Sequence, residues 1–396
     1  MSLVLVLFLN RLFPLTVQPY LFLGVVLAWS LSILNIVIVI PSASIRLSFL
    51  LFLLTFPIGL LVSTNPIRSW QVVAHLIVGV ALFVSLINSA NSNQRSEWIA
   101  WGIALLGIGL LLLEFFYMVV PEAYPSLFFV IKPSIILLRS LDDTINPNVL
   151  SGALIVTIPI SVAYVLLYFQ NRRWLRFLFY FVCCVLEISM ITWLQSRGAL
   201  WGVMIALMLM LILNGAYGSH QKSIFFCVLP LTIYTILNVQ FNSPILSGLD
   251  ERLEIWQRAL LAIQEFPLTG IGIGNFAQYV AERHPYTLFA PNVSIPHAHN
   301  LFLQVAVDLG IPGLISYLVL LAKLAQMLGD SLKEIEDMQN HFLRIGAAGA
   351  LVAMLIHGMI DVPMWDSKLA FLPWLLFALI VNLQFRSCKT AAMQSV

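Results

Sequence analysis

Long apolar runs separated by short polar segments make up most of the chain. A membrane-spanning helix needs about 20 predominantly apolar residues, and the pattern predicts twelve such spans. The first contains Arg11 and Pro14 and is the weakest, so eleven is the alternative number. We therefore expect an all-α polytopic membrane protein with one integral membrane domain, residues 1–396. The predicted spans are 1–16, 20–40, 47–63, 70–88, 98–120, 148–169, 175–195, 198–214, 223–240, 299–326, 341–360 and 368–385.

Two longer polar segments, 121–147 and 241–298, interrupt this pattern. Short loops rich in Lys and Arg mark the cytoplasmic side of a membrane protein, and the Asn-Arg-Arg-Trp-Leu-Arg loop at 171–176 is the best example in this chain. Placing that loop inside puts both termini in the cytoplasm. It also puts both long polar segments, here called the outer loops, on the opposite face of the membrane.

The larger outer loop, 241–298, is predicted to contain helices that lie at the membrane surface. Ser247 is a candidate N-cap and Pro267 a candidate terminator, and residues 275–284 could form a second, shorter helix. Between them the Gly-Ile-Gly-Ile-Gly run indicates a turn, because a dinucleotide-binding fingerprint requires a preceding strand. Apolar residues recur at helical spacing in the first helix, as expected of an amphipathic surface helix: Leu249, Leu253, Trp256, Leu260 and Ile263.

Composition agrees with a membrane protein. Hydrophobic residues make up 60% of the chain and charged residues only 10%, against roughly 25% charged in a soluble domain. The net charge of +2 gives no reason to expect a nucleic-acid partner. No cysteine lies in a long polar loop, so no disulfide framework is expected. The N-terminus lacks a basic region and a small-residue cleavage site, which favours an uncleaved first span.

Two histidines and an asparagine lie where the larger outer loop meets the next apolar helix: His297, His299 and Asn300. Imidazole is suited to general-base work near neutral pH, and His299 is the candidate base. A His-x-His pair could also bind a metal, but no third ligand stands at a typical spacing, so no metal is expected. Further along, His357 precedes Asp361 by one helical turn, which predicts a pair that orients the imidazole.

Three arginines are candidates for anion binding. Arg197 falls between two spans and could either reach the lipid headgroups or hold a phosphate in its fork. Arg252 shares a helical face with Trp256 and is a candidate for the site. Arg258 follows Glu254 by four residues, an order that favours a surface ion pair, and it remains a candidate for substrate binding.

The order of these motifs resembles the O-antigen ligase and O-antigen polymerase family of bacterial envelope glycosyltransferases. The resemblance covers roughly 140–320 and rests on Asn146-Pro-Asn148, Arg197 in a Ser-Arg-Gly turn, Arg252-x-x-x-Trp256, Pro267-Leu-Thr-Gly-Ile-Gly-Ile-Gly-Asn, and His297-Ala-His299-Asn300 before Gly310-Ile-Pro-Gly313. It implies transfer of a glycan from a polyprenyl-diphosphate-linked donor to a hydroxyl of a saccharide or lipid-linked acceptor, at the outer face of the bacterial inner membrane. No metal, nucleotide or other cofactor would take part.

Carried over residue by residue, the resemblance makes His299 the catalytic histidine and Arg197 and Arg252 the diphosphate-binding pair. His297, Asn300, Arg258, Trp256 and Asn148 would then contact substrate. Partners would be the lipid-linked donor, the acceptor and membrane lipid. Two alternatives remain: a transporter, for example of inorganic carbon, which would use intramembrane groups such as Glu114, Glu187 or His75, and a non-catalytic envelope scaffold.

Overall fold

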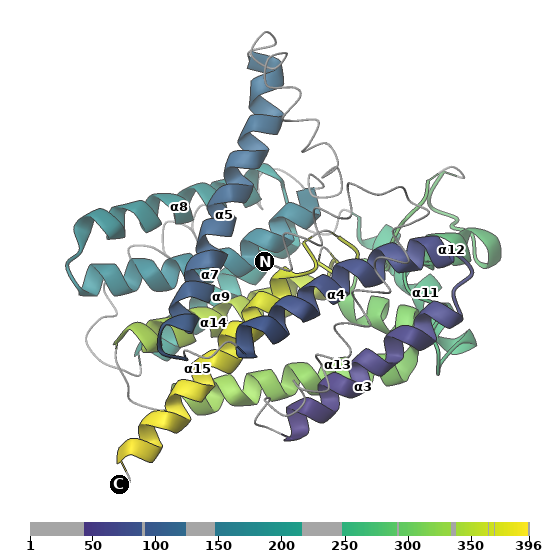
Figure 1. The fold of residues 1–396 in the computed structure, drawn as a ribbon. Helices are drawn as coiled ribbons and strands as arrows, with labels where there is room; N and C mark the ends of the chain where they lie inside the picture. The colour runs from purple at the N-terminus through teal and green to yellow at the C-terminus, as the bar shows by residue number, and fades with distance from the viewer. Residues whose placement is uncertain are drawn as a thin grey trace, which may run out of the picture.

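A computed structural model describes residues 43–88, 92–123, 147–215, 248–290, 293–333, 338–362, 364–367 and 369–394. These residues form helices and connecting turns, and no strand occurs among them. The predicted spans at 1–16, 20–40 and 223–240, and most of the outer loop at 121–147, lie outside the described residues. The helices (Figure 1) are α3 (Ala43–Leu61), α4 (Pro66–Asn88), α5 (Ser92–Ala123), α7 (Pro147–Gln170), α8 (Trp174–Trp193), α9 (Arg197–Gly215), α11 (Leu249–Glu265), α12 (Phe276–Arg283), α13 (Leu301–Leu332), α14 (Met338–Gly358) and α15 (Leu372–Gln394).

Seven of these helices are long and apolar enough to cross a membrane, namely α4, α5, α7, α8, α9, α13 and α14. Helices α3 and α15 contain shorter apolar stretches, Ile45–Leu61 and Leu372–Gln384. All nine coincide with predicted spans. The prediction of a helical membrane protein is confirmed, whereas the total of twelve spans is a prediction that the described residues do not test.

Helices α7 and α14 form the centre of the bundle. Helix α7 packs against α8 and α14, and α14 packs against α9 as well. Every residue from Val149 to Tyr168 in α7 is buried, as expected of a helix that is apolar all round. Helix α8 buries only part of one side and leaves Leu175 and Leu178 exposed, which fits a peripheral helix facing lipid.

A second group of helices packs beside this centre, with α13 against α3 and α15 against α4, α5 and α13. Aromatic rings fill the space between α3, α13 and α15. The ring of Phe52 lies 5.4 Å from that of Tyr317 and 6.2 Å from that of Trp365. Aromatic contacts of this kind stabilise a core beyond the area that they bury, so they fix the segment between α14 and α15 that carries Trp365.

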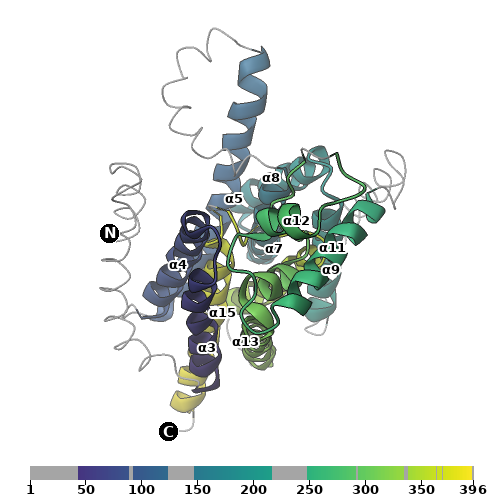
Figure 2. The same ribbon diagram turned by 90° about the vertical axis from the view of Figure 1, so that its right-hand side faces the viewer.

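Helices α11 and α12 lie together at one end of the bundle, which faces the viewer in Figure 2. Both were predicted, and α11 ends at Glu265, with Phe266 as its C-cap directly before Pro267, as expected. Its start differs slightly: the N-cap is Gly248, with φ of 79°, and no side chain caps the helix. The predicted cap, Ser247, lies outside the described residues. Helix α12 falls inside the predicted 275–284.

The apolar stripe predicted for α11 turns away from the protein. Leu253 and Leu260 are 45% and 48% exposed, whereas the opposite side buries Ile255, Ala259 and Ala262. Helix α11 packs against α13, and its buried residues join one apolar cluster with Val307 of α13. The exposed leucines remain available for the membrane surface, in keeping with the prediction of an amphipathic surface helix.

Candidate active site

The imidazole of His299 pairs with the carboxylate of Asp361. Nδ1 of His299 lies 3.0 Å from Oδ1 of Asp361, although 62 positions separate the two residues. His299 is the residue before Asn300, the N-cap of α13, and Asp361 follows the end of α14. Because the carboxylate engages Nδ1, the proton of a neutral imidazole belongs on that nitrogen. The other nitrogen, Nε2, then keeps its lone pair.

Four hydrogen bonds hold the backbone around His299. His299 itself has φ of 45°, in the left-handed region, which non-glycine residues occupy only when their surroundings hold them there. The indole Nε1 of Trp256 donates to the carbonyl oxygen of His299 at 3.3 Å. The side chain of Asn300 accepts from the backbone N–H groups of Phe302 and Leu303 and donates to the carbonyl of Met359 at 3.0 Å. Helix α13 therefore starts where it is tied to the end of α14.

Asp361 is buried, with 2% of its surface exposed. Burial alone would raise the pKa of this carboxyl. The hydrogen bonds from His297 and His299, together with the charge of those imidazoles, outweigh burial and hold the pKa well below its usual range. The backbone N–H of Val362 also donates to Oδ1, at 2.8 Å. Asp361 is therefore an ionised group that orients the histidines.

His297 contacts the same carboxylate oxygen as His299. Its Nε2 lies 3.4 Å from Oδ1 of Asp361, and its ring centroid lies 4.5 Å from that of His299. One ligand atom from each of His297, His299 and Asp361 lies within 4.8 Å of the others. The structure thus supplies the third potential metal ligand that the sequence did not reveal.

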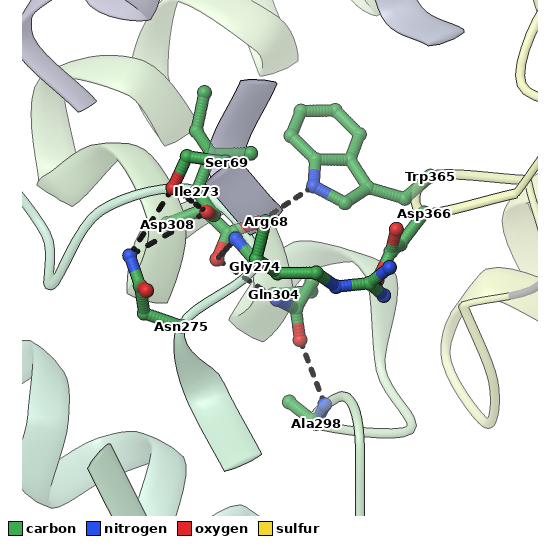
Figure 3. A network of polar contacts seen from close by, with 10 residues as sticks. All are labelled: Arg68, Ser69, Ile273, Gly274, Asn275, Ala298, Gln304, Asp308, Trp365 and Asp366. Carbon is green, nitrogen blue, oxygen red and sulfur yellow. Dashed lines mark hydrogen bonds and ion pairs between the residues drawn. The ribbon is translucent and has the colours of Figure 1, made fainter. Parts of the chain in front are cut away.

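A buried polar network supports the His297–Asn300 segment through Ala298 (Figure 3). The amide of Ala298 donates to Oε1 of Gln304 at 2.7 Å, and Nε2 of Gln304 donates to Oδ1 of Asp308 at 3.0 Å. Asp308 also accepts from the amide of Gly274 at 3.2 Å and from Nε1 of Trp365 at 2.8 Å. Asp308 is fully buried, and these donors replace its lost water. The network therefore links the larger outer loop, α13 and the segment after α14.

The same network continues to the turn between α3 and α4 (Figure 3). Nδ2 of Asn275 donates to Oγ of Ser69 at 3.3 Å, and that hydroxyl donates to the carbonyl of Ile273. The guanidinium of Arg68 forms an ion pair with Asp366. The start of α4 is thus tied to the segment that carries the His299–Asp361 pair.

The Gly-Ile-Gly-Ile-Gly run is a turn, as predicted. Gly270, Gly272 and Gly274 all have positive φ, at 67°, 92° and 75°. A Cβ on Gly270 would lie 2.5 Å from the carbonyl oxygen of Val307, so only glycine fits there. The amide of Ile271 donates to that same carbonyl at 2.8 Å. The turn therefore packs backbone against backbone on α13.

Helix α13 is kinked where the turn meets it. Gly310 has φ of 73° and ψ of 179°, which is not helical. A Cβ there would lie 2.6 Å from the carbonyl of Leu268. The amide of Ile311, which the kink releases, donates to the carbonyl of Pro267 at 2.7 Å. The kink and the close contact with the Leu268 backbone therefore coincide at Gly310.

Arg252 lies on α11, one helical turn before Trp256. It is half-buried, and no ion pair or side-chain hydrogen bond is found for it in the described ranges. Its charge lies within electrostatic range of the buried His357. His357 in turn lies against the first turn of α9, where a Cβ on Gly198 would be 2.9 Å from Nδ1. Arg197 is the first residue of α9. The positive N-terminal end of α9 therefore lies against His357.

The sequence paired His357 with Asp361, and that pairing is wrong. Asp361 bonds instead to His297 and His299, because the chain turns after Gly358 rather than continuing the helix. His357 and Asp361 still share the lining of one cavity. That cavity lies between α4, α13, α14 and α15 and is otherwise mostly apolar.

Arg258 occupies a different environment from Arg252. Its guanidinium bonds to Oε1 of Glu254 at 3.0 Å and to the carbonyl of Pro285 at 3.2 Å. The ion pair that the sequence favoured is therefore present. Asn148 lies in the first turn of α7, and the structure adds nothing to its assignment as a substrate contact.

Part of the chain is similar to a known protein family. Residues 149–318 match the family model described as O-Antigen ligase. Over this range the chain is similar to the O-antigen ligase family. A search of the curated proteins found no match. The matched range of the O-antigen ligase model includes Arg197, Arg252 and His299, and it ends before Asp361. This similarity and the apolar helices together support a multi-pass membrane enzyme of the ligase or polymerase type.

Proposed function

We propose that the protein transfers a glycan from a polyprenyl-diphosphate-linked donor to an acceptor hydroxyl at the outer face of the inner membrane. The observation that carries this proposal is the pairing of His299 Nδ1 with Asp361 at 3.0 Å. Arg252 lies on the helix whose Trp256 bonds to the carbonyl of His299, and it has no ion pair among the described residues. This arrangement supplies a base and a cation. Those are the two groups that transfer from a diphosphate donor requires.

In the proposed reaction the acceptor oxygen attacks the anomeric carbon of the donor. Nε2 of His299 takes the hydroxyl proton, and Asp361 stabilises the imidazolium that forms. The bond from the anomeric carbon to the diphosphate oxygen breaks, and the diphosphate leaves on its lipid. Its negative charge is stabilised by Arg252, Arg197 and the N-terminal end of α9. The donor is already activated, so neither a nucleotide nor a metal takes part.

The other candidate residues take positioning roles in this proposal. Trp256 holds the backbone of His299, and Asn300 holds the start of α13. Arg258 stabilises the larger outer loop through Glu254. Both termini are assigned to the cytoplasm, which places the site on the outer face.

The test uses the full-length protein in a deletion strain and after purification. His299→Ala should abolish glycan transfer while membrane insertion remains normal. The matched control is His284→Ala, because His284 also lies in the larger outer loop, half-buried, but bonds to Glu265 at 2.7 Å away from the site. Normal glycans in the His299→Ala strain would refute the assignment. Altered bicarbonate uptake with normal glycans would support a transporter, for which the buried Glu187 is the candidate group.

A further inference from the structure

We infer that His297, His299 and Asp361 form an inhibitory site for a first-row divalent metal ion such as Zn²⁺. This inference rests on the proposed function, since it concerns regulation of the same histidine. The family resemblance gives no reason to expect a metal here. The argument comes from the geometry of the three side chains.

The three groups converge on one point. Nδ1 of His299 and Nε2 of His297 lie 3.0 Å and 3.4 Å from the same oxygen of Asp361. All three ligand atoms fall within 4.8 Å of one another. A tetrahedral ion with bonds of roughly 2.0–2.1 Å separates its ligand atoms by about 3.3 Å. The present separations therefore need only small side-chain movements.

The chemistry of the ligands selects the metal. Two imidazoles and one carboxylate form the kind of ligand set that binds Zn²⁺, with a fourth position open to water. Such a set disfavours Mg²⁺ and Ca²⁺, which prefer oxygen ligands. The carboxylate of Asp361 is already held by the amide of Val362 at 2.8 Å, so the ligand is fixed before the ion arrives. Both imidazoles are half-buried, which leaves them accessible.

Binding of the ion would block catalysis through the tautomer of His299. A metal on Nδ1 uses the lone pair of that nitrogen and leaves the proton of the neutral ring on Nε2. Nε2 then has no lone pair with which to accept a proton from the acceptor hydroxyl. The ion also takes the carboxylate of Asp361 away from its role in stabilising an imidazolium. Metal occupancy and base catalysis are therefore mutually exclusive.

The experiment measures binding directly, on purified full-length protein without donor or acceptor. Co²⁺ is titrated and followed by the visible absorption of the tetrahedral ion, and Zn²⁺ is then added as competitor. We expect saturable Co²⁺ binding that Zn²⁺ displaces. In His297→Ala and Asp361→Asn, the affinity for Co²⁺ and Zn²⁺ should fall by more than the roughly 10–100-fold that is typical when a residue bonded to a metal ligand is replaced. It should be unchanged in His284→Ala. His297→Gln provides a second variant in case His297→Ala does not fold.

A second measurement links binding to activity. Transfer by the wild-type protein should fall in step with Zn²⁺ occupancy and return after EDTA treatment. Equal metal affinity in the wild type, His297→Ala and Asp361→Asn would overturn the inference. The inference would also be overturned if Zn²⁺ inhibited the wild-type protein without displacing bound Co²⁺. If the wild type binds metal but transfers no glycan, the proposed function fails while the metal site stands.

Discussion

The indole of Trp256 donates a hydrogen bond to the backbone carbonyl of His299, at 3.3 Å and across 43 positions of the chain. This bond connects α11 to a residue whose backbone lies in the left-handed region, with φ of 45°. Helix α11 thereby contributes to the conformation of the proposed base. The same helix also presents Arg252.

Trp256→Phe should weaken transfer without unfolding the protein. Phenylalanine keeps most of the ring packing but cannot donate the hydrogen bond, which contributes about 0.5–1.5 kcal/mol. We expect kcat to fall by about 2–10-fold, with little change in KM. Steady-state kinetics on the purified protein would measure this. An unchanged kcat would show that the carbonyl of His299 does not need this donor.

Asp361→Asn should lower kcat by about 100-fold or more, because general-base catalysis contributes roughly 10²–10⁴-fold. Asparagine has nearly the same shape but cannot stabilise an imidazolium. A purely structural role for Asp361 would instead raise KM or reduce the amount of folded protein. The two parameters are separated by varying the acceptor concentration, with the melting temperature as a control for folding. A loss confined to KM would contradict the positioning role.

Replacing the two arginines on α11 should affect different properties of the protein, activity for Arg252 and stability for Arg258. Arg252→Ala should lower transfer strongly and change the unfolding temperature little, because Arg252 has no ion pair among the described residues. Arg258→Ala should cost about 1–3 kcal/mol of stability, because it leaves the buried carboxylate of Glu254 without its cation. Thermal unfolding and transfer assays on both variants would check this. A transfer defect in Arg258→Ala at normal stability would favour substrate binding by Arg258.

Glu254 should make the stability of the larger outer loop depend on pH. Burial would raise the pKa of Glu254, but hydrogen bonds from Thr287 and Leu288 and the charge of Arg258 lower it overall. An unfolded glutamate has a pKa of about 4.3. Its stabilising effect is therefore complete above pH of about 4.3 and is lost as pH falls through the lower folded value.

The measurement compares proteolysis of the outer loop in the wild type and in Glu254→Gln across this pH range. The stability difference between the two proteins should be largest above pH of about 4.3 and should shrink below it. A difference that stays constant with pH would show that the ionised carboxylate does not provide the stabilisation.

Gly310→Ala should destabilise the protein by about 1–3 kcal/mol, the usual cost of a strained backbone conformation. The added Cβ would also meet the carbonyl of Leu268 at 2.6 Å. Gly329→Ala in the same helix is the matched control, because a Cβ there has no neighbour within 4 Å. The control should change stability by no more than about 1 kcal/mol. Equal unfolding temperatures for the two variants would contradict this account of the kink.

Local signals in the sequence predicted much of the fold. Hydropathy located the spans that the structure describes, and Pro267 marked the end of α11, because each signal depends on residues that are close in the chain. The side of α11 that packs against the protein was harder to predict. Leu253 and Leu260 belong to the obvious stripe and are exposed. The small residues Ala259 and Ala262 are buried instead, in the apolar cluster that includes Val307 of α13. Amphipathicity shows that a helix has two sides, but not which side meets the protein.

The site also combines residues that local sequence identifies with partners that it does not. His299 was identifiable from its position at the start of a span, but Asp361 lies 62 residues later and was matched to the nearer His357. Sequence distance favoured that choice, and only the turn after Gly358 reverses it. Gln304, Asp308 and Trp365 were missed as a supporting network for a related reason. Their bonds join separate elements, and the sequence signal that could have identified them is a buried carboxylate within an apolar span.

The kink at Gly310 has a consequence for building hybrid proteins. The N-terminal part of α13 forms two backbone hydrogen bonds with the Pro267–Ile271 turn. These bonds require both the turn and the kinked helix to keep their backbone conformations. A chimera joined at the membrane boundary near Leu301 would separate pieces that fit one another. An exchangeable module would instead extend from the start of α11 through Ile311, so that the donor protein supplies both sides of the junction.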